Sequence, residues 1–369
     1  SLLFTRSSRR RFAARLNSGV RPRDGCLSPH SLFDLPFQPL RRKVVDELPP
    51  QAAGCIYPAL EFAMLSKRGL TDHAPATTPG GIAWRRLRAS ARMLGALLLG
   101  WVAVMGSVQV VGKGLVPLID SVFHPGADLL SAIRRACIFL AAVAGYWSYV
   151  HWYEKRDVTE LRLRLVPLLL GGAGGAALMA VPIALLFALG AYQLVLFRGA
   201  SPALMDAAIL IVIAATLEEL VFRCVLFRVL ERSWGTWAAL AMQAVLFAIW
   251  HLGNVERGGI GDVVTMLVSV TLAGLLWGAV FILTRNLWAT AANHAAWNFT
   301  ILLSGVPLSG NEDWRAIAPL ESHFAGPDWL TGGMFGPESS LLVIVSTSVA
   351  VVLLLRAARR RGTFFLPVA

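Results

Sequence analysis

The chain has 369 residues, of which 56% are hydrophobic and 15% charged, and its mean hydropathy is +0.61. So much apolar surface cannot be buried in one soluble core, so lipid must solvate part of it. The 34 Lys and Arg residues exceed the 22 Asp and Glu residues. Because they lie beside apolar runs, without nucleic-acid-binding motifs or interleaved aromatic residues, we expect membrane lipid and no nucleic acid as a partner.

The four cysteines show no CxxC pair and no metal-ligand spacing, so they predict neither a disulfide framework nor a zinc–thiolate site. We expect Cys224, which lies inside an apolar run, to serve packing. The other three are Cys26, Cys55 and Cys137.

Residues 1–92 form a basic N-terminal segment that we expect to be disordered. Residues 1–63 are rich in Arg and Pro and lack apolar periodicity. Either Met64 is the true initiator and the upstream residues are spurious, or the stretch SSRRRFAARLNS is a transit peptide, since it is basic and poor in acidic residues. The first interpretation places the protein in a bacterial plasma membrane and the second in an organelle membrane.

Apolar runs of spanning length, roughly 20 residues each, begin at about residue 93. We predict an all-α polytopic membrane bundle of about eight transmembrane helices over residues 93–361, with its polar core at about 203–304. The predicted helices span residues 93–119, 136–153, 166–190, 203–230, 237–253, 263–284, 286–304 and 340–356.

Basic residues favour one orientation of this bundle, because cytoplasmic loops carry an excess of Lys and Arg. On this rule both ends of the bundle are cytoplasmic. The longest loop, 305–339, carries five acidic residues against Arg315 alone, as suits the opposite face. The basic clusters lie at about 85–92, 155–164, 228–232, 285 and 356–361.

The first polar motif is TLEELVFR, in the fourth predicted helix. Glu219 and Arg223 are four residues apart, so they share one helix face in the order favoured for an ion pair. Glu218 points about a quarter turn away, which leaves it free to face another helix. The alternative is that the two adjacent acidic side chains are solvated by water at a helix end. Ionisable side chains within an apolar run, however, have a high free-energy cost in the membrane and therefore indicate a function.

The second motif is FAIWH, in the fifth predicted helix. A turn at 233–236 should close helices four and five into a hairpin, with Glu218 about 16 residues before its centre and His251 about 17 after it. The two side chains should therefore face each other. Phe247 lies four residues before His251, on the same helix face, where it could form an aromatic wall. A single histidine here could also be an interfacial or packed residue.

The third motif is HAAWN, in which His294 and Asn298 share one helix face. Asn293 and Trp297 should point elsewhere. Neutral His and Asn side chains suit a carbonyl oxygen on which negative charge develops. The alternative is that they hydrogen-bond neighbouring helices, as buried polar residues do in membrane bundles.

The order EExxxR, FxxxH and HxxxN on successive apolar segments resembles the CPBP family, the CAAX-prenyl-protease and bacteriocin-processing group of intramembrane proteases. All three motifs match in residue type, spacing and order over residues 216–300. The basic linker YEKRDVTELRLRL is also similar to that of the family, whereas residues 1–63 and 305–339 have no counterpart.

The resemblance implies an intramembrane endopeptidase without a covalent intermediate. In the family the glutamate at Glu218 and the histidine at His251 activate a water, while His294 and Asn298 stabilise the oxyanion. The supporting residues would be Glu219, Arg223 and Phe247.

The resemblance leaves the substrate and the metal dependence open. Relatives cleave prenylated CAAX proteins, bacteriocin leader peptides and other membrane-anchored peptides, and nothing in the loops selects one. We expect no cofactor, since a carboxylate-activated water needs no ion and HExxH is absent. The alternative is a zinc enzyme with Glu218, His251 and His294 as ligands.

Two other functions use the same residues. A catalytically silent membrane scaffold would keep the fold without activity, although the intact motif set argues against it. A proton-coupled transporter could use the buried Glu and His as a relay. Transporters usually show repeated halves or broken helices in matched positions, and neither is evident here.

Overall fold

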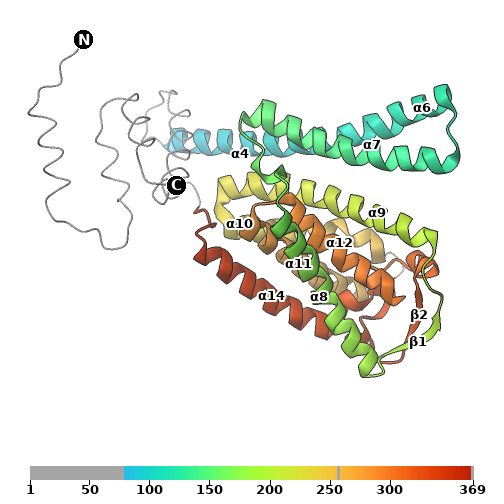
Figure 1. Ribbon diagram of the computed structural model, residues 1–369. Coiled ribbons are helices and arrows are strands. Elements are labelled where there is room, and N and C mark those ends of the chain that lie inside the picture. The colour runs from blue at the N-terminus through green and yellow to red at the C-terminus, as the bar shows by residue number, and fades with distance from the viewer. Residues whose placement is uncertain (1–78, 256–257, 367–369) are drawn as a thin grey trace, which may run out of the picture. The chain divides into compact units, whose positions relative to one another are not determined.

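A computed structural model of the chain describes residues 79–255 and 258–366 (Figure 1). Contacts divide the chain into residues 1–83 and 84–369, and apart from the first turn of one helix, which begins at Pro79, the features that follow lie in the second unit. Residues 1–63, which we interpret as either spurious or a transit peptide, lie outside the described residues. Most of the described chain is helical, which confirms the predicted all-α class, with one added two-stranded sheet.

Each of the eight predicted spans coincides with a helix, or with most of one, among the described residues. Within the described part of the chain, four stretches are long and apolar enough to cross a membrane: Trp84–Phe123, Leu165–Ala188, Ile260–Thr284 and Leu341–Arg360. The protein is therefore an integral membrane protein, and the count of eight spans stays a prediction. The helices are α4 (Pro79–Trp101), α5 (Ser107–Val110), α6 (Val116–Phe123), α7 (Ala127–Ser148), α8 (Leu165–Ala188), α9 (Pro202–Glu219), α10 (Arg228–Trp250), α11 (Ile260–Thr284), α12 (Leu287–Ser304), α13 (Asp328–Thr331) and α14 (Leu341–Arg360).

The first long helix starts earlier than the apolar run that predicts it. Helices α4, α5 and α6 follow one another through π-helical turns, and α4 begins at Pro79. Residues 79–92, which we assigned to a disordered segment, are therefore helical. Arginine and alanine are good helix formers, so the helix extends past the apolar residues that would lie in lipid.

The hairpin that carries the first two motifs forms as predicted. Helix α9 continues through a π-helical stretch, Leu220–Phe227, into α10. Such stretches often occur at functional sites. Within α10 the chain breaks at Gly235, whose φ of 79° favours a residue without a Cβ. This break lies in the predicted turn at 233–236 and returns the chain antiparallel to α9.

Glycines on α8 let it pack closely against α12, as the Gly-rich sequence predicts. A Cβ at Gly171 or Gly175 would lie 2.2 or 2.0 Å from a carbonyl oxygen of α12. Asn293 donates to the Gly171 carbonyl at 2.9 Å. Because this face of α12 is held against α8, its other face, with His294, turns toward α9 and α11.

The long loop 305–339 folds against one end of the bundle. Its strand β2 (Leu320–Phe324) pairs antiparallel with β1 (Tyr192–Phe197), which follows α8. The Tyr192 hydroxyl donates to the Thr331 carbonyl at 2.5 Å. The loop is therefore fixed to the bundle and contributes to its core.

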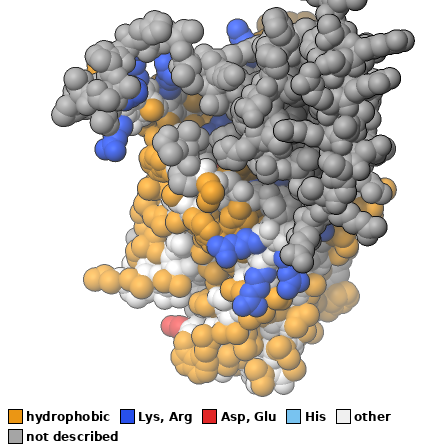
Figure 2. Space-filling model, turned by 90° about the vertical axis from the view of Figure 1, so that its left-hand side faces the viewer, with side chains coloured by type: hydrophobic (Ala, Val, Ile, Leu, Met, Phe, Trp, Pro, Cys, Tyr) orange, Lys and Arg blue, Asp and Glu red, His pale blue; other side chains and the backbone are white. Residues whose placement is uncertain are grey.

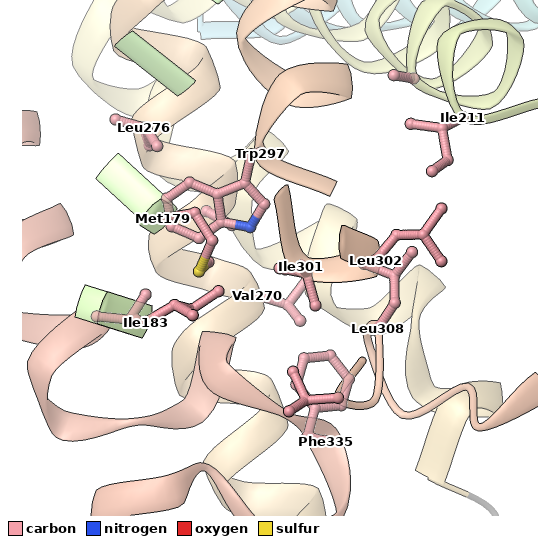
Figure 3. Close-up of a cluster of buried hydrophobic side chains, with 14 of the residues drawn as sticks. Met179, Ile183, Ile211, Val270, Leu276, Trp297, Ile301, Leu302, Leu308 and Phe335 are labelled. Atoms are coloured by element: carbon pink, nitrogen blue, oxygen red, sulfur yellow. The ribbon is translucent and has the colours of Figure 1, made fainter. Parts of the chain in front are cut away.

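The main core joins helices from distant parts of the chain. Helix α12 packs against α8 and α9, while α11 packs against α10 and α14. Figure 3 shows side chains of four helices and of the loop converging. The residues labelled there are Met179, Ile183, Ile211, Val270, Leu276, Trp297, Ile301, Leu302, Leu308 and Phe335.

Arginines lie at the opposite end of the bundle from this loop. Figure 2 shows a face on which Lys and Arg side chains gather among hydrophobic ones. Arg228 contacts Glu154 at 2.7 Å and Glu160 at 2.6 Å, and so ties the linker after α7 to α10. Burial raises the pKa of Glu154, but the charges of Arg228 and Arg232 outweigh it and lower the pKa to about 2.

The C-terminal residues are held at the same end. Arg285 contacts Glu231 at 2.5 Å and donates to the Thr363 carbonyl at 2.5 Å. The backbone N–H groups of Thr236 and Phe365 each donate to the other residue, at 3.1 and 2.8 Å. The end of α14 is thus connected to the turns that follow α9 and α11.

Candidate active site

The catalytic residues predicted from the three motifs share one cavity. It has a volume of about 170 Å³ and lies between α9, α10, α11, α12 and the loop 305–339. Glu218, His251, His294 and Asn298 all line it, as does Phe247. The structure therefore brings together every residue that we expected to act on the substrate.

Glu218 lies between the two imidazoles. Its Oε2 is 3.9 Å from Nε2 of His251 and 3.9 Å from Nε2 of His294. These separations are too long for direct hydrogen bonds and suit one bridging water. Oε2 is buried and has no hydrogen-bond partner. A buried polar atom without a partner needs water or a ligand, so this oxygen is available for chemistry.

His251 presents one defined nitrogen to the cavity. Its Nδ1 lies 2.8 Å from the Phe247 carbonyl oxygen, which can only accept, so Nδ1 carries the proton and donates. In the neutral ring Nε2 then carries the lone pair and faces Glu218. The Phe247 ring packs against the imidazole with centroids 4.5 Å apart, as its spacing predicts.

Glu219 and Arg223 form the predicted ion pair below the cavity. The guanidinium lies 3.0 Å from the carboxylate, and both side chains are 0% exposed. Arg223 also donates to the Gly274 carbonyl at 3.3 Å and lies over the Phe247 ring at 4.6 Å. The pair thereby ties α9 to α11.

His294 has two contacts that the motif spacing did not predict. Its Nδ1 lies 2.9 Å from Oε1 of Glu219, the same oxygen that pairs with Arg223. Trp277 of α11 stacks on its ring, with centroids 3.5 Å apart and planes 19° apart. His294 is therefore held between two carboxylates and against an indole.

Asn298 extends the polar wall that His294 begins on α12. Its Oδ1 is buried without a hydrogen-bond partner, so the amide is available to water or substrate. Asn293 and Trp297 point elsewhere, as predicted. Asn293 bonds Gly171, and Trp297 donates to Glu338 at 3.3 Å.

Loop residues that motif analysis missed close the cavity on one side. Asn254 and Asn311 line it and are exposed. The cavity therefore opens at the end of the bundle that carries the loop, away from the arginine-rich end. No periodicity marks these residues, because they belong to irregular segments. The other loop residues that line the cavity are Leu308, Ser309, Trp314 and Glu338.

The three residues proposed as alternative zinc ligands are spaced more widely than the ligand atoms of a zinc site. Ligand atoms on one tetrahedral zinc lie about 3.3 Å apart, given bonds of roughly 2.0–2.1 Å. Here Oε2 of Glu218 is 3.9 Å from each Nε2. Across residues 79–255 and 258–366, no three His, Cys, Asp or Glu side chains are arranged to hold a metal ion.

The structure thus combines a helical membrane bundle with a buried carboxylate that faces two imidazoles across a cavity. The model of the family described as type II CAAX prenyl endopeptidase, Rce1-like, matches residues 200–300. That range holds all three motifs. The family match confirms, over residues 200–300, the resemblance drawn from the motifs. No curated protein matches the chain.

Proposed function

We propose that the protein is an endopeptidase that hydrolyses a peptide bond of a membrane-associated substrate with a water held by Glu218 and His251. One observation carries the proposal. Oε2 of Glu218 is buried, has no partner, and lies 3.9 Å from each of two imidazole nitrogens. A water that bridges these atoms lies within hydrogen-bonding reach of the Glu218 carboxylate, which can act as its base.

In this mechanism Glu218 takes one proton from the water while the water oxygen attacks the carbonyl carbon of the substrate. His251 holds the water through Nε2, since its Nδ1 is occupied by the Phe247 carbonyl. The tetrahedral intermediate then collapses, the C–N bond breaks, and the proton passes to the leaving amine. Water supplies the hydroxyl of the new carboxyl group and the proton of the new amine, so the step is balanced.

His294 and Asn298 stabilise the oxyanion. Nε2 of His294 faces Glu218 and the cavity, while Nδ1 of the same ring contacts Glu219 at 2.9 Å, which fixes the orientation of the imidazole. Removing one donor of an oxyanion hole typically costs about 100- to 1,000-fold in kcat.

The proposed substrate is a peptide anchored in or beside the membrane, either a prenylated CAAX-type protein or a leader-type peptide. The match to the family of type II CAAX prenyl endopeptidases supports the CAAX type. The mechanism above is metal-free, because the carboxylate and the imidazole together supply the base. A silent scaffold and a proton-coupled transporter predict no cleavage, so one assay separates them from the protease.

The test uses purified protein in proteoliposomes with prenylated CAAX, unprenylated and leader-type peptides. We expect wild type to cleave at least one class and Glu218→Gln to cleave none, since the amide fills the same volume but cannot take a proton. Glu312→Gln is the matched control, because Glu312 is on the surface and contacts Arg315. Wild-type turnover by Glu218→Gln would remove Glu218 from the reaction.

A further inference from the structure

Ser309 lies at the mouth of the cavity in an unusual backbone conformation. Its φ is +50°, in the left-handed region, and Gly310 follows at +80°. A residue with a Cβ rarely adopts this conformation outside a turn. It persists where the surroundings fix it, and such residues gather at functional sites.

Two hydrogen bonds fix Ser309 from opposite sides. Its hydroxyl donates to Oε2 of Glu338 at 2.7 Å, and its carbonyl accepts from Nδ2 of Asn254 at 3.0 Å. The next residue, Gly310, donates its N–H to the Phe335 carbonyl at 2.9 Å. Ser309 thus joins the turn that holds Asn254 to the segment that holds Glu338.

The Asn254 side leads to His251. Asn254 lies in a short helical turn, Leu252–Val255, and its N–H donates to the His251 carbonyl at 2.9 Å. His251 is the residue that follows α10 and caps its C-terminal end, and its backbone has left helical geometry, with φ −90° and ψ 3°. The position of His251 therefore depends on the turn that follows as well as on its contact with Phe247.

The Glu338 side leads to His294. Glu338 accepts from the indole N–H of Trp297 at 3.3 Å. Trp297 meets Trp277 edge to face at 6.2 Å, and Trp277 stacks on His294. Burial raises the pKa of Glu338, while hydrogen bonds from Ser309 and Trp297 oppose this. A buried carboxyl satisfied by two neutral donors is costly to keep and indicates a role.

We propose that Asn254, Ser309 and Glu338 form a clasp across the cavity mouth that sets the position of His251 relative to His294 and Glu218. The proposal rests on the proposed function, because it explains how the catalytic spacing is kept. The three are positioning residues, since they act through the histidines. No motif includes them, and two of the three lie beyond residues 200–300.

The clasp explains how His251 keeps its position at the C-terminal end of α10, beside the open cavity. The last turn of a helix has few hydrogen bonds of its own. A displacement of about 1 Å in a catalytic group can lower the rate by up to about 100-fold. Tying the turn after α10 to the α12 side of the cavity prevents that displacement.

Ser309→Ala breaks the hydroxyl bond and keeps the carbonyl bond, so it is the central variant. Ser346→Ala is its matched control, because Ser346 bonds only within α14. We expect Ser309→Ala to lower kcat by about tenfold with little change in KM, and Ser346→Ala to leave both unchanged. Glu338→Gln, which keeps an oxygen for Ser309, should retain more activity than Glu338→Leu.

Hydrogen exchange tests the clasp without relying on activity. In Ser309→Ala the amides of residues 252–255 should exchange faster, as well as those of 306–312, although only the latter adjoin the substitution. Unchanged exchange at 252–255, or kinetics of Ser309→Ala equal to those of Ser346→Ala, would overturn the clasp. If wild type cleaves no peptide, the proposed function fails, and the exchange result still decides whether the clasp exists.

Discussion

The loss of Arg223 should strongly destabilise the fold. Its guanidinium is fully buried, 3.0 Å from Glu219, and it also donates to the Gly274 carbonyl. Replacing Arg223 with Ala leaves the Glu219 carboxylate without its cation in a low-dielectric setting. The remaining partner of Glu219 is the imidazole of His294.

The expected cost follows from this burial. Breaking a fully buried ion pair by removing one partner costs about 3–5 kcal/mol, and no allowance for solvent screening applies at 0% exposure. An unfolding entropy of about 0.6 kcal/mol/K for roughly 290 residues converts this cost into a fall in Tm of about 5–8 °C. Arg223→Lys should recover part of it, because an ammonium cannot reproduce the fork that reaches Glu219 and Gly274 together.

Thermal unfolding of the purified protein in detergent measures this effect. Arg232→Ala is the control, because Arg232 also pairs with a glutamate but is 51% exposed, where such pairs contribute less than about 1 kcal/mol. Arg223→Ala should lower Tm and yield without changing the order of preference among cleaved peptides. Normal Tm together with full activity would show that Glu219 does not depend on Arg223.

Three further predictions test the charge network, the metal dependence and the orientation. The pKa of Glu154 is about 2, against an ordinary value of 4.5. The ionised carboxylate therefore stabilises the fold fully above pH 4.5, and this stabilisation is lost as the pH falls through 2. The Tm of the wild type should decline over that range, and the Tm of Glu154→Gln should decline less. Metal chelators should leave turnover unchanged, and a loss reversed by Zn²⁺ would contradict the metal-free mechanism. In a cysteine-free protein, Asn311→Cys should react with an impermeant maleimide from the non-cytoplasmic side, and Arg361→Cys only after permeabilisation. The opposite labelling would reverse the predicted orientation.

Helical spacing was sufficient to predict the contacts within single helices and across the hairpin. Glu219 and Arg223 share a face of any α-helix, so their pairing needs no tertiary information. Counting from the turn at 233–236 likewise placed Glu218 opposite His251, because both arms rise equally per residue. The same reasoning separated His294 and Asn298 from their neighbours on α12.

Helical spacing could not predict contacts that depend on how one helix is rotated against another. Trp277 lies in an apolar stretch of α11 without a polar neighbour to mark it, and only packing brings it onto His294. The bond from His294 to Glu219 depends on how closely α12 approaches α9. The sequence does not give that distance, although the glycines of α8 fix how closely α8 approaches the other side of α12.

The loop wall of the cavity has a further consequence for the site. The family match covers residues 200–300, and the chemistry of the three motifs lies within it. Leu308, Ser309, Asn311, Trp314 and Glu338 lie outside it and line the same cavity. On the proposed function, a change at a loop residue outside the clasp, such as Trp314, can alter which peptides reach Glu218. A change at Ser309 or Glu338 should alter turnover as well, because both belong to the clasp that positions His251.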